Sequence, residues 1–522
     1  MIKASISFSD LAAAPLLHDG QVHVGNSRIT PYPHRSLEIF VICTKGRWFM
    51  TVRERMADGQ PGQSGQMVSV SEERFERLHR EALLWPLDYL MVEVAQAGFR
   101  LKLHAGMLGT APVYFRATDT GMTVSYDLAD LLTRPCVLDA WIVSRRLGMH
   151  ADYSARQICT GVLLLTERAV VFARPGSVRY QYPMAVEPAL AESESQREDS
   201  VASFEAWLDH VMQARPLEVG SAAIELSGGM DSATVACALG ERSKRLTSLG
   251  ILLDDNEGQQ TRRREAIVRN LGLSDHTIAM SEFPPSLDLR PRTGHMEYPL
   301  ADFYLEAFES IWDTARARGC DVILTGLGGD QLFPVYLDEL QSESGSGNAI
   351  VASARQRADA LLTPAALEAS RALPAIDAPP GPLQASLLAS NLCQSPHLLK
   401  RGLWPISPLG DPQLASRCQR LPFPSRRDRR TMREYLARRL GTEIFALGYT
   451  KETFAPVLPA LISSQAKQIR AQLDQCALAD MGLVNRNAAL TLLDDLVRTR
   501  ERSLTAPLAS FLWMERFARQ FA

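Results

Sequence analysis

The spacing of hydrophobic residues divides the chain into two regions. From Met1 to about Pro183 the apolar runs are short and often alternate with polar residues, as in SLEIFVIC and FRLKLHAG, and Gly, Asp and Thr separate them. This pattern is typical of a β-rich domain. Beyond residue 200, short apolar runs alternate with segments of helical period. That alternation predicts a parallel sheet covered by helices on both faces.

The same pattern indicates where the domains meet. At 522 residues the chain exceeds the size at which one core keeps growing, so we expect two domains. An acidic stretch from Met184 to Ser200 separates the two patterns, which predicts one domain over residues 1–190 and a second over 200–522. Residues 341–385 are rich in Ala, Ser, Gly and Pro and predict a mobile insertion or loosely packed helices. The remainder of the chain has a helical apolar period.

Composition excludes several classes of protein. With 46% hydrophobic residues, 22% charged residues and a net charge of −3, the chain is neither disordered nor a polyelectrolyte, and no nucleic-acid partner is implied. Its 8 cysteines are scattered without a C-x-x-C pair, which favours a reducing compartment. The sequence shows no signal peptide and no apolar window long enough for a membrane span. We therefore expect a cytoplasmic protein.

A first Gly-rich segment, SGGMDS, begins at Ser227 directly after the apolar run SAAIEL. Gly228 and Gly229 allow the backbone to approach phosphate oxygens, and a following helix N-terminus stabilises negative charge. Ser232 and Ser227 add hydroxyl donors, whereas Asp231 would repel a bare phosphate and so indicates a shared Mg²⁺ ion. Taken alone, the hexapeptide also fits an ordinary turn with a helix cap.

A second Gly-rich segment, TGLGGDQLF, begins at Thr325, which is the last residue of the apolar run DVILT. The carboxyl ends of parallel strands meet at one edge of a sheet, so this turn should face the first one. Asp330 would then offer a second carboxylate to the same Mg²⁺, and Gly326, Gly328 and Gly329 would leave room for pyrophosphate. Two such loops in register predict a nucleotide site.

The two loops, in this order and spacing, resemble the synthetase domain of asparagine synthetases and their relatives. These relatives include the β-lactam synthetases and the lasso-peptide macrolactam synthetases, or lasso cyclases. The segment Leu103 to Leu132 is similar to a stretch of the family's N-terminal amidotransferase-like sandwich. WPISPLGDPQL, from Trp404, and YTKETF, from Tyr449, resemble two later segments of the synthetase domain. The resemblance covers nearly the whole chain.

The resemblance implies a fold and a set of functional residues. The fold is α/β plus α+β: an Ntn-type β-sandwich without its nucleophile, then a doubly wound pyrophosphatase-loop (nucleotide α-hydrolase-like) domain with a helical extension. ATP and Mg²⁺ are the implied cofactors, with Asp231 and Asp330 as metal ligands. Lys451, together with both aspartates, is the implied catalytic group, because an ammonium can offset charge as pyrophosphate leaves. The implied ATP-binding residues are Leu226, Ser227, Gly228, Gly229, Asp231, Ser232, Leu252, Gly326, Gly328 and Gly329.

Departures from the family pattern concern the nucleophile. Glutamine-hydrolysing members need a cysteine where this chain has Ile2, so ammonia from glutamine is not the expected nucleophile. The acidic residue that usually follows Asp330 is Gln331, and the next glycine is replaced by Pro334. The glutamate that activates the amine in some relatives has no counterpart around 401–406. The activation half is therefore retained, whereas the acceptor side is altered.

Among the relatives, lasso cyclases fit this pattern. Such an enzyme adenylates an Asp or Glu side chain of a precursor peptide and closes a macrolactam with the peptide's α-amine. A leader-binding protein and a leader peptidase are the implied pathway partners. A β-lactam synthetase, an asparagine-synthetase-like ligase for a small molecule, and a nucleotide-binding pseudoenzyme are the alternatives. The basic run from Ser425 to Leu440 is interpreted as a solvated helix face.

Overall fold

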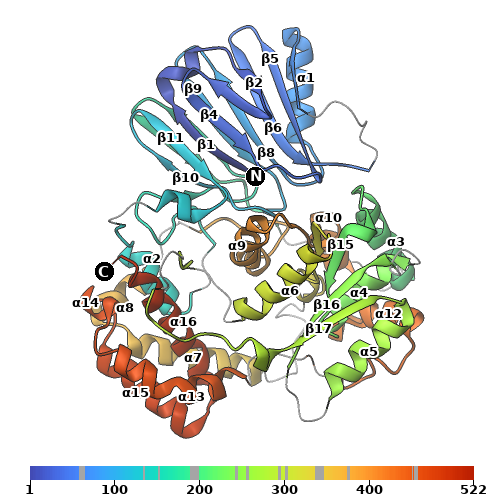
Figure 1. Ribbon diagram of the computed structural model, residues 1–522, viewed down its shortest axis with the longest axis vertical. Helices are drawn as coiled ribbons and strands as arrows, with labels where there is room; N and C mark the ends of the chain where they lie inside the picture. The colour runs from blue at the N-terminus through green and yellow to red at the C-terminus, as the bar shows by residue number, and fades with distance from the viewer. Residues whose placement is uncertain are drawn as a thin grey trace.

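The computed structural model contains two mainly antiparallel sheets, one parallel sheet and a helical region (Figure 1). It describes residues 1–522 except for 58–64, 133–135, 151–152, 188–198, 241–244, 254–257, 292–295, 300–303, 335–345, 373–376, 450, 452–456 and 522, and it leaves out the side chains of 346–351.

The N-terminal region is built from two seven-stranded sheets. In spatial order, the first contains β12 (Leu163–Leu164), β10 (Tyr114–Ala117), β11 (Gly121–Ser125), β1 (Ile2–Ser7), β4 (Ser27–Pro31), β3 (Gln21–Val24) and β2 (Leu16–His18). The second contains β14 (Ser177–Gln181), β13 (Val170–Arg174), β9 (Arg100–Ala105), β8 (Tyr89–Ala95), β6 (Arg47–Glu54), β5 (Leu37–Thr44) and β7 (Gln66–Ser69). Apart from the parallel pair of β5 and β7, the described pairs are antiparallel. The predicted β-rich region is therefore confirmed.

The alternation of side chains along β6 shows how this region is packed. Trp48 and Val52 point into the core that the two sheets share, whereas Phe49 points to the opposite face. There Phe49 meets Phe75 of α1 (Glu72–Leu83), with the ring centroids 5.2 Å apart. Because successive strand residues face opposite sides, one strand can serve both layers. Helix α1 consequently covers the outer face of the second sheet (Figure 1).

A five-stranded parallel sheet forms the centre of the second region. Its spatial order is β17 (Ser274–Ala279), β16 (Thr247–Leu252), β15 (Ala222–Glu225), β18 (Val322–Leu324) and β19 (Trp404–Ile406). Ile224 packs with α3 (Ser200–Gln213), α4 (Met230–Ala238) and α12 (Arg430–Leu440), whereas Ala223 packs with α6 (Leu305–Ala317). The predicted parallel sheet with helices on both faces is confirmed. Helices α5 (Gln259–Leu271), α9 (Ala385–Lys400), α10 (Pro412–Arg420) and α11 (Phe423–Arg426) complete this region.

The remaining helices form a separate hydrophobic cluster. Its helices are α2 (Ala140–Leu147), α7 (Ser346–Leu361), α8 (Pro364–Arg371), α13 (Val457–Gln472), α14 (Ala477–Asp480), α15 (Arg486–Thr499) and α16 (Arg502–Ala518). The predicted helical C-terminal part is thus confirmed. Within the expected insertion, α7 and α8 are packed helices that bury Leu361 and Ala366, while 341–345 and 373–376 lie outside the described residues.

Glu54, a buried carboxylate, links the β-rich region to the parallel sheet. Its Oε2 accepts a hydrogen bond from Arg215 Nη2 at 2.7 Å, and its Oε1 accepts one from Trp404 Nε1 at 2.7 Å. The expected domain boundary falls largely on residues 188–198, which lie outside the described part, so its position stays a prediction. In the described residues, no helix is long and apolar enough to cross a membrane.

Candidate active site

The first Gly-rich loop lies between β15 and α4, as the sequence predicts. Gly228 has a φ of +86°, a conformation that side-chain-bearing residues rarely adopt, and Gly229 is the N-cap of α4. Ser227 Oγ accepts a hydrogen bond from the amide of Gly229 at 3.2 Å and lies 3.3 Å from Ser232 Oγ. The loop thus presents a glycine backbone and two hydroxyls at a helix N-terminus, an arrangement suited to an anion.

The second loop follows β18 and packs directly against the first. Strands β15 and β18 are parallel neighbours, so both loops leave the same edge of the sheet. A methyl group at Gly326 would lie 2.8 Å from the amide nitrogen of Ser232, and one at Gly329 would lie 2.4 Å from Asp231 Cγ. Gly328 has a φ of +97°. These glycines are therefore needed for the close approach of the two loops.

Four charged side chains meet where the loops touch. Arg429 Nη1 donates to Asp231 Oδ1 at 2.8 Å and to Asp330 Oδ1 at 3.1 Å. Lys451 Nζ lies 2.5 Å from Asp330 Oδ2 and 3.5 Å from Asp231 Oδ2. We call Asp231, Asp330, Arg429 and Lys451 the charged centre. The structure thus brings together the three residues that the sequence analysis assigned to catalysis and adds a fourth.

The surroundings change the protonation equilibria of two of these groups. Burial raises the pKa of Asp231 above its ordinary value, the nearby positive charge of Arg429 opposes this, and the negative charge of Asp330 adds to it. Burial alone would lower the pKa of Lys451, but its hydrogen bond to Asp330 and the charge of Asp231 raise the pKa above its usual value. Lys451 is therefore positively charged at neutral pH.

Arg429 is a site residue that the sequence analysis missed. It lies in the basic run that was interpreted as a solvated helix face, and that interpretation is wrong for Arg429 and for the fully buried Arg426. The guanidinium of Arg426 donates to backbone carbonyls of Leu421 and Pro334. The helical period of the run gave no signal for either role, because the partners of both arginines are fixed by the tertiary fold.

Tyr449 and Gln260 were also missed. The Tyr449 hydroxyl is buried and has no hydrogen-bond partner in the described part of the chain, and it lies 3.4 Å from where a Cβ on Gly229 would be. Gln260 Nε2 donates to the carbonyl of Ser227 at 2.9 Å, and its Oε1 accepts from the amide of Leu253 at 2.8 Å. Gln260 therefore ties the first loop to the end of β16. The orphaned hydroxyl at a helix N-terminus is a donor available for a phosphate oxygen.

Two residues predicted to contact the nucleotide lie at the ends of neighbouring strands of the sheet. Leu226 is fully buried directly after β15, and its carbonyl accepts a hydrogen bond from Arg264. Leu252 is the half-buried last residue of β16, the strand next to β15. Both residues therefore lie at the carboxyl edge of the sheet, as expected for residues near the loops.

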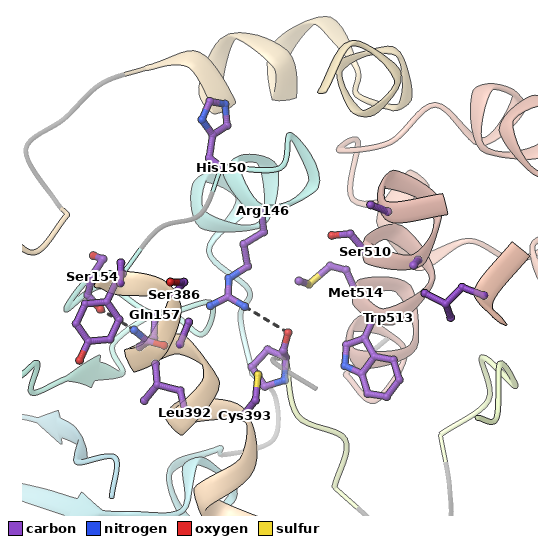
Figure 2. A pocket seen from close by; sticks show the side chains of 17 residues that line it. Arg146, His150, Ser154, Gln157, Ser386, Leu392, Cys393, Ser510, Trp513 and Met514 are labelled. Atoms are coloured by element: carbon purple, nitrogen blue, oxygen red, sulfur yellow. Dashed lines mark hydrogen bonds between the residues drawn. The ribbon is translucent and has the colours of Figure 1, made fainter. Parts of the chain in front are cut away.

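A cavity of about 450 Å³ is connected to the second loop by one hydrogen bond. The link is Gln331, which follows Asp330 and donates to Ser386 Oγ at 3.1 Å, and Ser386 lines the cavity. Figure 2 shows the Arg146 side chain between Ser386 of α9 and Met514 of α16. Arg146 Nη1 donates to the carbonyl of Pro299 at 3.3 Å. The cavity therefore has walls from α2 in the first 190 residues and from α9 and α16 in the later part of the chain.

The lining of this cavity is mostly apolar, and its charge has one sign. No Asp or Glu is among its described lining residues, whereas Arg146 supplies a cation. The described lining residues are Arg146, His150, Tyr153, Ser154, Gln157, Pro299, Ala385, Ser386, Ala389, Leu392, Cys393, Leu458, Ala506, Ala509, Ser510, Trp513 and Met514.

Ile2 occupies the position that carries the nucleophile in glutamine-hydrolysing relatives. It lies on β1, is 1% exposed, and packs in the core between the two sheets. The side chain is a hydrocarbon and offers no nucleophilic atom. The prediction that this region hydrolyses no glutamine rests on that residue.

Comparison with known proteins finds a family match within the second region. Residues 204–392 match the family model described as asparagine synthase. The amidase chyE of Penicillium rubens is 24% identical over 217 residues, a match that covers 38% of this chain and 32% of that protein. The chain thus matches about a third of the length of this relative. Both Gly-rich loops lie within residues 204–392, the part of the chain that is similar to asparagine synthase.

Proposed function

We propose that this protein closes a macrolactam ring in a precursor peptide, as a lasso cyclase does, at the expense of ATP. One side-chain carboxylate of the peptide is adenylated, and the peptide's N-terminal amine then attacks it. The observation that carries the proposal is the charged centre, in which two carboxylates from two loops share two cations, and which Gln331 links to the cavity through Ser386. The expected domains are an amidotransferase-like scaffold over residues 1–190 and a pyrophosphatase-loop adenylating domain over 200–522 in a cytoplasmic enzyme.

The residues of the charged centre fit MgATP. The glycine amides at the start of α4 and the orphaned Tyr449 hydroxyl offer donors to phosphate oxygens. Asp231 and Asp330 would hold Mg²⁺, which would neutralise the charge of the leaving pyrophosphate. Arg429 and Lys451 pair with these carboxylates, and their N–H groups would turn to phosphate oxygens when nucleotide binds.

The proposed reaction has two steps. A substrate carboxylate oxygen attacks the α-phosphorus of ATP, the bond to the β-phosphate oxygen breaks, and pyrophosphate leaves. Lys451 offsets the charge that accumulates on the α-phosphate oxygens. A neutral amine then attacks the acyl carbon, AMP leaves with the electrons of the acyl–oxygen bond, and the amine loses one proton.

The lining of the cavity supports a peptide over a free amino acid. A free amino acid is a zwitterion, and its ammonium would find no acidic partner among the described lining residues. An attacking amine must be neutral, and a wall without carboxylates does not favour its protonated form. The volume of about 450 Å³ suits several side chains of a folded peptide. Holding both ends of one peptide there would supply the effective concentration that ring closure needs.

Exchange of radiolabelled pyrophosphate into ATP tests the proposal. We expect exchange with a core peptide that carries an Asp or Glu at the ring position, none with its Ala variant, and a product lighter by one water. Asp231→Asn should abolish exchange, whereas Asp428→Asn, an exposed neighbour of Arg429, should not. Exchange with aspartate or another small carboxylate alone would replace the peptide proposal with the small-molecule alternatives.

Absence of exchange with every carboxylate, together with ATP binding, would point to the pseudoenzyme. The proposed partners are the precursor peptide, a leader-binding protein and a leader peptidase of the same pathway. Co-purification of the ligase with a leader-binding protein, with and without precursor peptide, would test that part separately.

A further inference from the structure

Two histidines and a glutamate meet on the outer face of the second sheet, beneath helix α1. His79 Nε2 lies 3.1 Å from Glu93 Oε2, and His104 Nε2 lies 3.2 Å from the same oxygen. His79 lies on α1, Glu93 on β8 and His104 on β9. The three potential ligand atoms all lie within 4.8 Å of one another. Helix α1 and strands β8 and β9 therefore bring three potential ligand atoms close together.

Two of the three spacings between these atoms match those of ligands on a tetrahedral ion. Zinc binds imidazole nitrogen and carboxylate oxygen at about 2.0 to 2.1 Å, so two ligand atoms at a tetrahedral angle lie about 3.3 Å apart. Both nitrogen-to-oxygen distances are close to that value. Small side-chain rotations would therefore suffice to seat an ion between the three groups.

The surroundings of Glu93 suit a ligand. Its Oε2 faces both histidines, and its Oε1 faces Lys102. The side chains of the two histidines are 13% and 12% exposed, so water can reach the site and complete a coordination shell.

Lys102 is the natural competitor for a metal ion. Its Nζ lies 2.9 Å from Glu93 Oε1, which leaves Oε2 to the two histidines. The Lys102 side chain is 35% exposed, so the ammonium can turn to solvent. A nearby positive charge disfavours a divalent cation, and removing that charge should strengthen metal binding.

We propose that His79, Glu93 and His104 form a Zn²⁺ site that fastens helix α1 to the sheet. Two imidazoles and one carboxylate are a donor set that zinc uses in proteins, and a water would take the fourth position. The site lies in the β-rich half, whereas the charged centre lies on the parallel sheet, and the proposal is independent of the proposed function. Because an ion that binds only the folded chain stabilises it, zinc should raise the melting temperature.

Metal titration of the chelator-treated full-length protein tests this site. We expect calorimetry and metal analysis to show one tightly held zinc per chain, with Co²⁺ at the same site giving the visible spectrum of tetrahedral coordination. His104→Gln and His79→Gln should each weaken binding by about 100-fold or more and abolish the zinc-dependent rise in melting temperature. Lys102→Gln should bind zinc more tightly than the parent protein.

Control variants separate this site from the rest of the molecule. His18→Gln, at an exposed histidine, and Asp231→Asn, in the charged centre, should keep the zinc stoichiometry and the cobalt spectrum. Circular dichroism of each metal-free variant shows whether it is folded. Folded parent protein that takes up no zinc at micromolar concentration, or zinc binding that survives both histidine substitutions, would overturn the proposal.

Discussion

The ammonium of Lys451 lies 2.5 Å from Asp330 Oδ2, joining two residues 121 positions apart in the chain. Lys451 also lies 3.5 Å from Asp231 Oδ2, so one cation faces both carboxylates of the charged centre. The two aspartates lie on loops that follow different strands, β15 and β18. Lys451 follows α12 in the chain. Lys451 therefore lies where the two loops meet.

Lys451→Met should lower the rate of pyrophosphate exchange by about 100-fold or more, because a developing charge would lose its preorganised donor. Lys451→Arg should restore part of the rate, since it keeps the charge but changes the geometry. Steady-state kinetics with ATP measures both. Lys467→Met, at an exposed lysine on α13, is the matched control and should leave the rate unchanged. An active Lys451→Met variant would remove this residue from catalysis.

Tyr449→Phe should weaken ATP binding without weakening the fold. The hydroxyl has no partner among the described residues, so its removal relieves an unsatisfied buried group and should stabilise the nucleotide-free protein slightly. If the hydroxyl donates to a phosphate, the KM for ATP should rise about 5- to 10-fold. Thermal melting and ATP titration of the exchange rate measure the two effects.

Tyr32→Phe provides the opposite case. The Tyr32 hydroxyl donates to the carbonyl of Leu399 at 2.7 Å, so its loss should cost about 1 kcal/mol of stability and leave the KM for ATP unchanged. If Tyr449→Phe behaved like Tyr32→Phe, with lower stability and an unaltered KM, its role would be structural.

Gly329→Ala should disable the site by separating the two loops. The added methyl group would lie 2.4 Å from Asp231 Cγ, so Asp231 or the second loop must move. We expect a loss of about 100-fold in exchange, since catalytic groups displaced by about 1 Å lose rates of that order. Gly220→Ala is the control, because its methyl group would meet only the end of the Arg245 side chain, at 3.2 Å. Equal activity of the two variants would contradict the close packing of the loops.

Local patterns were enough to predict the parallel sheet and the meeting of its two loops. The run SAAIEL contains β15, the following SGGMDS contains the start of α4, and DVILT contains β18. Each of these elements is specified by neighbouring residues. The proximity of Asp231 and Asp330 then follows because parallel neighbours end at one edge.

Long-range partners could not be predicted in the same way. Arg429 lies in a run of basic residues, and its carboxylate partners are 198 and 99 residues away. The cavity combines Arg146 of the first half with Cys393 and Met514 of the second. Such meetings depend on how whole elements pack, and no local spacing or composition reports them. The predicted metal and nucleotide roles of the loop residues therefore stay predictions on a confirmed arrangement.

Asp88, a buried carboxyl next to β8, should add its own contribution to the pH dependence of stability. Burial raises the pKa of Asp88 from 3.8 to about 6, and the negative charge of Glu54 adds to this rise. Hydrogen bonds from Thr110 act in the opposite direction and lower the pKa. Between these two values the folded protein binds more protons than the unfolded chain, so its stability falls as the pH rises. This contribution is fully lost and constant only about one pH unit above the folded pKa of about 6.

Asp88→Asn should remove this dependence. Asparagine carries no charge, so the free energy of unfolding of the variant relative to the parent should increase by about 2 kcal/mol between pH 4 and pH 7. Asparagine has one carbonyl oxygen, whereas Asp88 accepts from the amides of Thr110 and Tyr89, so about 1 kcal/mol is lost at every pH. The variant should therefore be less stable than the parent at pH 4 and more stable at pH 7.

Urea unfolding of the parent, Asp88→Asn and Asp19→Asn across this range measures the effect. Asp19 is a highly exposed carboxylate, so the stability of its variant should follow that of the parent at each pH. A difference between Asp88→Asn and the parent that does not change with pH would mean that Asp88 is ionised in the folded protein, with its charge compensated by groups near the start of β1. A difference that grows only between pH 4 and pH 6 would identify Asp88 as the titrating group, because it is the loss of this one proton that the substitution removes.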